Sequence, residues 1–141
     1  EESLDPDLWL RDGEGNIDGQ RLDPEEGHHV FNHERHVAQN VFDAIRKGEI
    51  ENQELVDELL SIVDSLVSVD RQLAEVAIAD AEAEGGDADE IDEALDFLDR
   101  GNELVAEAEE ESDREDVADL LYEALDNSFR HAWDAAIDAV E

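Results

Sequence analysis

The chain has 141 residues, enough for one domain with a hydrophobic core. Asp and Glu number 44 against nine Lys and Arg, and the resulting net charge of −35 excludes ordinary nucleic-acid binding, which needs basic side chains against phosphate. The absence of Cys excludes disulfides and thiolate metal sites. The sequence contains no run of 18 apolar residues, which is about the length that a membrane-spanning helix needs.

The composition resembles that of proteins from organisms that accumulate salt, in which dense carboxylates hold water and monovalent cations and lysine is scarce. Like charges four residues apart on a helix cost about 0.2–0.5 kcal/mol per pair, and Glu103 and Glu107 are one of many such pairs. A domain has only about 5–15 kcal/mol of net stability, whereas molar salt shortens the Debye length to about 3 Å and screens most of the repulsion. We therefore expect a halophilic protein. A disordered acidic tail is disfavoured because 40% of the residues are hydrophobic and in phase with a helix.

Residues 1–22 lack helical periodicity, and the acidic, glycine-rich stretch 12–19 could form a short hairpin or an irregular loop. We expect an irregular N-terminal arm here, with Trp9 packed against the rest of the protein because burial of a large aromatic side chain is favourable. The chain begins at Glu1 and not at Met, so either a leader has been removed or the sequence was designed to begin there. On this ground an extracellular or cell-surface location is slightly favoured.

A first helix is predicted to begin at Asp23, which can act as the N-cap, with Pro24 in the first turn and Glu26 completing a capping box. It is predicted to end near Lys47, with Gly48 as its stop. The predicted apolar face consists of Val30, Phe31, Val37, Ala38, Val41, Phe42 and Ile45.

The longest helical pattern runs from Asn52 to Glu84 and stops at Gly85. One apolar row alternates spacings of four and three residues, which is typical of a helix packed along a partner helix. A second row widens the apolar stripe, so this helix needs neighbours on two sides and should be the centre of the fold. The first row is Leu55, Leu59, Ile62, Leu66, Val69, Leu73 and Val76, and the second is Val56, Leu60, Val63, Val67, Ala74 and Ala77.

A third helix is predicted after an Asp87 cap, with Gly101 as a weak point in its middle that costs about 1 kcal/mol. Ser112 and Glu115 form a capping box that begins a fourth helix. Four helices joined by short links predict an all-α fold, an antiparallel up-down four-helix bundle over residues 23–141.

Four of the five histidines fall between His28 and His36. On a helix, His29, His33 and His36 form one stripe, and imidazoles four residues apart can share a transition metal. This stripe lies away from the apolar face, so the metal site would be on the surface. The competing interpretation is a polar helix face that happens to be rich in histidine.

A second candidate metal site lies in the arm, where Glu14, Asn16, Asp18 and Glu25 match the calcium loop of an EF-hand with Glu in place of the first Asp. Two features count against calcium binding: Arg21 stands where an apolar residue is usual, and no helix clearly precedes the loop. Chance matches are also frequent in an acidic chain.

Glu34 falls within the apolar face of the first helix, where a buried carboxylate needs a partner. His131, at the edge of the apolar row of the fourth helix, could pair with it and form an interior metal, acid–base or small-ligand site. The interpretation we favour is that Glu34 lies beyond the packed zone or reaches solvent.

Tyr122, Phe129 and Trp133 form an aromatic row on the fourth helix. Such a row is more often core than binding surface. The alanines beside it could instead supply the core, however, and an exposed aromatic row would then mark an interface with a second subunit or another protein.

No glycine-rich phosphate loop, nucleophile elbow or convincing Ser–His spacing is present, so we expect no enzymatic activity. The sequence favours a non-catalytic helical structural or interaction module that binds itself or a protein partner. The alternative is a metal-binding helical protein that uses His29, His33 and His36, with a transition metal or calcium as the candidate cofactor.

Overall fold

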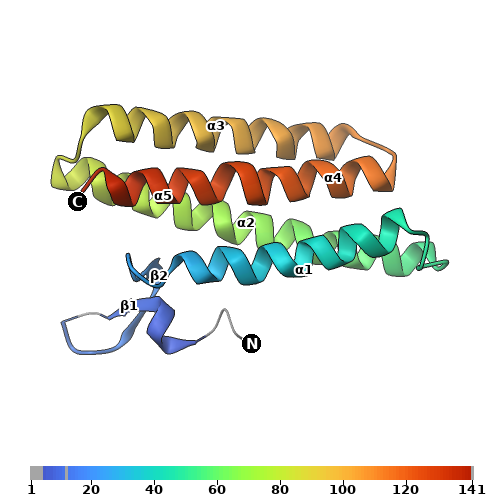
Figure 1. The fold of residues 1–141 in the computed structure, drawn as a ribbon, viewed down its shortest axis with the longest axis horizontal. Helices are drawn as coiled ribbons and strands as arrows, with labels where there is room; N and C mark the ends of the chain where they lie inside the picture. The colour runs from blue at the N-terminus through green and yellow to red at the C-terminus, as the bar shows by residue number, and fades with distance from the viewer. Residues whose placement is uncertain (1–4, 12, 141) are drawn as a thin grey trace.

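Four helical rods lie side by side and alternate in direction in the computed structural model, which describes residues 5–11 and 13–140 (Figure 1). Three rods are single helices: α1 (His28–Arg46), α2 (Gln53–Glu84) and α3 (Ala88–Glu110). The fourth is continuous and consists of α4 (Arg114–Ala124), the π-helical turn η3 (Leu125–Phe129) and α5 (Arg130–Asp138). Both α2 and the fourth rod contact all the other rods, whereas α1 and α3 lie on opposite sides (Figure 1). The predicted four-helix bundle is therefore confirmed.

Short polar side chains begin three of the helices. Asn52, Asp87 and Asp113 cap α2, α3 and α4, and each side chain accepts hydrogen bonds from the backbone N–H groups two and three residues further on. The cap of α4 lies one residue later than predicted, because the N–H of Ser112 donates to the Glu111 side chain at 2.7 Å and Ser112 stays outside the helix.

The first helix also begins later than predicted. The Asp23 side chain accepts hydrogen bonds from the N–H groups two and three residues ahead, but the chain then continues as turns and α1 begins only at His28. Gly27, the residue before α1, is closely packed, since a Cβ there would lie 2.5 Å from the Cβ of Leu22 and 3.1 Å from the Trp133 ring. A side chain at this position would therefore collide with the arm and with the fourth rod. The predicted end of α1 is confirmed at Arg46.

The arm forms the short hairpin that was one of its two predicted alternatives. It contains the 3-10 turn η2 (Pro6–Leu8) and the antiparallel strands β1 (Trp9–Arg11) and β2 (Ile17–Leu22). Trp9 is half-buried against the core, as predicted. The Arg21 guanidinium donates two hydrogen bonds to the Asp80 carboxylate of α2, at 2.6 and 3.1 Å, so a bidentate ion pair ties the arm to the bundle.

The prediction that both apolar rows of α2 pack against neighbouring helices is wrong for the first row. The second row is buried except for Ala77, which is half-buried, whereas Leu55, Ile62 and Val69 of the first row are 43%, 51% and 41% exposed. The second row faces the space where α1, α3 and the fourth rod meet, and the first row lies at the outer edge. Burial of the first row is restricted to Leu73 and, in part, Leu59, Leu66 and Val76.

Gly101, the predicted weak point of α3, is a close-packing position. It is buried beneath Phe129 of η3, and a Cβ on Gly101 would lie 2.5 to 2.9 Å from three atoms of that ring. The missing side chain therefore leaves room for an aromatic ring at the π-helical turn. The packing of Phe129 offsets the helix cost of the glycine, about 1 kcal/mol.

We expect the Gly101→Ala substitution to lower the free energy of unfolding by about 1–3 kcal/mol, because Phe129 must shift within a close-packed core. This would occur although Ala favours helix over Gly. Denaturant unfolding in molar salt measures the effect. Gly19→Ala is the control, since no heavy atom lies within 4 Å of a Cβ at Gly19. A Gly101→Ala protein as stable as the parent would contradict this packing argument.

Candidate functional site

A polar layer crosses the core of the bundle. Glu34 on α1, Asp70 on α2 and Ser128 on η3 are the buried polar residues of the described chain. Each of the three comes from a different rod. Buried apolar residues form two large clusters, and on each rod the polar residue stands in sequence between a member of one cluster and a member of the other. The flanking cluster members are Phe31 and Ala38 on α1, Val67 and Leu73 on α2, and Leu125 and Ala132 on the fourth rod.

The two carboxyl groups of this layer perturb each other. Burial raises the pKa of Asp70 well above its ordinary value, and the neighbouring Glu34 carboxyl raises it further. Burial also raises the pKa of Glu34, while its hydrogen bond with Asp70 acts in the opposite direction. No donor among the described residues reaches either Asp70 oxygen, so a hydrogen bond between the two groups requires one of them to be protonated. The pair can therefore hold a shared proton in the core.

Two sequence interpretations of Glu34 need correction. Its side chain does not reach solvent, because Glu34 is only 7% exposed. Its neighbour is Asp70 and not His131, whose ring stacks on Phe97 of α3 with centroids 5.2 Å apart. Sequence reasoning missed Asp70, although a signal was present: Asp70 follows Val63 by seven residues and so continues a buried row of α2.

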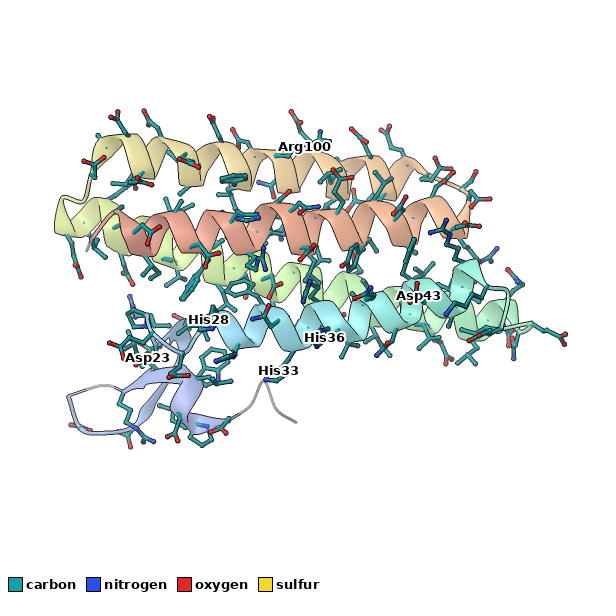
Figure 2. The ribbon with its side chains drawn as sticks, in the orientation of Figure 1. Asp23, His28, His33, His36, Asp43 and Arg100 are labelled. Carbon is teal, nitrogen blue, oxygen red and sulfur yellow. The ribbon has the colours of Figure 1, made fainter. Side chains whose placement is uncertain are left out.

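The histidine stripe lies on the surface of α1, and His33 and His36 project away from α3 (Figure 2). The rings of His29 and His33 have centroids 6.5 Å apart, and the Nε2 atom of His29 lies 3.5 Å from a carboxylate oxygen of Glu26. Within residues 5–11 and 13–140, no three His, Asp or Glu side chains are arranged to hold a metal ion. The described residues therefore supply no third ligand to the histidine stripe, and the metal site stays a prediction.

The EF-hand match has no EF-hand geometry either. The loop follows a β-strand and not a helix, and Asp18 belongs to β2. The Asp18 carboxylate accepts hydrogen bonds from the N–H of Gln20 at 3.0 Å and from the Arg21 guanidinium at 2.9 Å. Glu14 and Asn16 precede that strand, and Glu25 lies in the turns before α1.

The aromatic row of the fourth rod is core and not interface, which corrects the expectation that it could face a partner. Phe129 and Trp133 are buried, and Trp133 packs against Phe31 with centroids 5.4 Å apart. Tyr122 is half-buried and stacks on Phe42 with centroids 6.1 Å apart. Trp133 and Tyr122 thus join the fourth rod to α1, and Phe129 packs over Gly101 of α3.

The exposed apolar surface lies instead on α2. We call its outward side the α2 outer face and define it by Leu55, Leu59, Ile62, Leu66 and Val69. Three of these residues belong to the seven large apolar side chains that are exposed in the described part of the chain. The polar side chains beside them include Glu58, Ser65 and Gln72.

Val37 of α1, 45% exposed, extends this surface. It lies one helical turn from Glu34, which faces Asp70 of α2, and one turn from Val41, which packs in the same cluster as Leu66. Val37 therefore lies on the side of α1 that adjoins α2. The apolar surface runs along both helices.

No family model matches the chain, and neither the curated proteins nor the solved structures give a significant match. None of the helices in residues 5–11 and 13–140 combines the length and the apolar character needed to cross a membrane.

Proposed function

We propose that the protein is a non-catalytic helical interaction module whose α2 outer face packs against another helix. One observation carries this proposal: an apolar row of spacing four and three reaches the surface of a protein otherwise rich in carboxylates, with Leu55, Ile62 and Val69 exposed and Leu59 and Leu66 half-buried. Side chains at that spacing can insert between the side chains of a facing helix, as in a coiled coil. A contiguous exposed apolar surface rimmed by polar residues is typical of a protein-binding site.

We also propose that the module works in high salt. The excess of 35 carboxylates has no basic side chain to pair with. The closest ion pairs, Arg114 with Asp57 and Arg21 with Asp80, are about half exposed and join elements far apart in sequence. Screening by molar salt would remove the repulsion between the remaining carboxylates, which favours a halophilic setting.

A synthetic helical peptide tests the binding role. A dye-labelled peptide of four heptads, with Leu and Ile at the a and d positions and Ser and Gln beside them, is held at nanomolar concentration in 3 M KCl while protein is added. We expect a saturable rise in fluorescence anisotropy, and its loss in Ile62→Asp, because a carboxylate in the row must be desolvated on binding.

Leu95→Asp is the matched control, since it places the same charge at an exposed apolar position of α3. This variant should bind the peptide as the parent does. Equal binding by the Ile62→Asp protein, or no binding by the parent protein, would refute a helix-binding role for the α2 outer face.

A further inference from the structure

We propose that the helix covering the α2 outer face is α2 of a second copy of this chain, packed antiparallel about a twofold axis. This inference rests on the proposed function, which assigns the face to helix binding but leaves the partner open. Two features of the face favour a second copy, its charge and its register, and its extent indicates how tightly the two copies would bind.

The charge distribution allows a like-charged partner to approach at this face. Between Leu59 and Leu73 the residues that flank the apolar row on its solvent side are Ser65 and Gln72, and the carboxylates of this stretch are elsewhere on the helix. Asp64 lines a groove on the α3 side, and Asp70 is buried. A basic partner would be recognised by acidic residues beside the apolar row. A second copy of this chain is acidic, so it needs uncharged residues beside the row, and α2 has them between Leu59 and Leu73.

The spacing of the row is self-complementary when α2 is reversed. A twofold axis crossing α2 near Asp64 places each member of the α2 outer face opposite an apolar residue. The exposed and half-buried pairs are Ile62 with Leu66 and Leu59 with Val69, and Leu55 lies opposite Leu73, which is buried at the edge of the core.

The residues that flank the row are compatible with the same register. Ser65 lies opposite Ser65 of the second copy, and Glu58 lies opposite Gln72, so these flanking pairs contain no two opposed carboxylates. A parallel pair would bring the acidic ends of both α2 helices together, with Glu51, Glu54 and Glu58 from each. Repulsion therefore favours the antiparallel arrangement.

The extent of the face suits a weak dimer. At 1.5 Å per residue, the face from Leu55 to Val69 is about 21 Å long. With Val37 and Val41 of α1 beside it, the surface is about two helices or 20 Å wide. Its area of roughly 420 Å² is about half of the roughly 800 Å² that each partner contributes to a stable interface, so we expect a dimer that forms only as the protein concentration rises.

Sedimentation equilibrium in 3 M KCl tests the partner. We expect the parent protein to approach twice the chain mass of 15.8 kDa as its concentration rises. Ile62→Asp should stay at the monomer mass, and Leu95→Asp on α3 should dimerise like the parent. A parent protein that is monomeric at every concentration would overturn the proposal, as would a dimer that Ile62→Asp leaves intact.

Cysteine cross-linking tests the register, and the chain has no Cys of its own to interfere. The Glu58→Cys and Gln72→Cys proteins are prepared separately, mixed, and treated with a short thiol-reactive cross-linker. We expect covalent dimers in the mixture and none with either protein alone. Dimers formed by Glu58→Cys alone would show a parallel pair and contradict the antiparallel one.

The results separate this inference from the function on which it rests. If the parent binds the heptad peptide but stays monomeric, the second copy is excluded and helix binding stands. If the parent neither binds the peptide nor dimerises, both proposals fail.

Discussion

Replacing Asp70 with Asn is expected to raise the free energy of unfolding at pH 9 by about 1–4 kcal/mol. In the parent protein, Asp70 and Glu34 are buried against each other and cannot both ionise without a large desolvation cost. The amide introduced by this substitution stays neutral and can donate a hydrogen bond to the Glu34 carboxylate. Denaturant unfolding in molar salt measures the gain.

The pH dependence of this gain has a definite sign. Because the pKa of each carboxyl is raised by folding, the folded protein keeps a proton that the unfolded chain has released. Stability from the pair is therefore fully present below the unfolded pKa of about 4 and is lost as the pH rises towards the raised folded pKa. We expect the stability difference between Asp70→Asn and the parent to widen from pH 4 upwards.

Asp64→Asn is the control for this prediction. It removes the same charge from the same helix, but Asp64 is exposed and no buried partner is involved. Its effect on stability should be small and should not widen with pH in the same way. If Asp70→Asn destabilises the protein at every pH, Asp70 does not share a proton with Glu34.

The second large effect is expected from salt. Below roughly 1 M KCl, we expect the circular dichroism signal of the helices to fall, because the screening length increases and the 35 excess carboxylates repel one another. Restoring KCl should restore the signal. The loss should be cooperative, since all four rods share one core.

An uncharged osmolyte tests whether KCl stabilises the helices by screening charge or by being excluded from the protein surface. Sucrose at the same osmolality stabilises folded proteins without screening charge, so it should restore less helix than KCl. Full helicity in dilute buffer would contradict the proposed high-salt environment, and complete rescue by sucrose would contradict the screening explanation.

Turn chemistry explains why the helix ends could be predicted from the sequence. Gly48 and Gly85 have positive φ values of 66° and 75°, a conformation that favours glycine, so each is a local signal for a helix end. The start of α1 could not be predicted in this way, because the Asp23 side chain accepts the expected hydrogen bonds but caps a run of turns and not the helix itself.

The core row of α2 could not be chosen from periodicity alone. Both apolar rows fit one helix, and together they occupy a wider part of the circumference of α2 than the neighbouring rods cover. The positions of α1, α3 and the fourth rod decide which row is buried. That leaves Leu55, Ile62 and Val69 exposed, and the sequence could not show this before the neighbours were placed.

The polar layer was only half visible in the sequence. Glu34 stands out as a charge on an apolar face, but its partner Asp70 is 36 positions away on a helix whose two apolar rows were both predicted to pack against neighbours. The π-helical turn that carries Ser128 contains no Gly or Pro that would mark a break in the fourth helix. Gly101, which packs against Phe129 of this turn, was predicted to be a weak point of α3.

Methyl NMR of isoleucine-labelled protein at increasing concentration in 3 M KCl tests the use of the α2 outer face most directly. Ile62 and Ile17 are similarly exposed, at 51% and 46%, but Ile17 lies on β2 and away from the face. We predict that the Ile62 methyl signal shifts progressively as the protein concentration rises while the Ile17 signal stays fixed. An Ile62 signal that does not move, or an Ile17 signal that moves as far, would contradict self-association through α2.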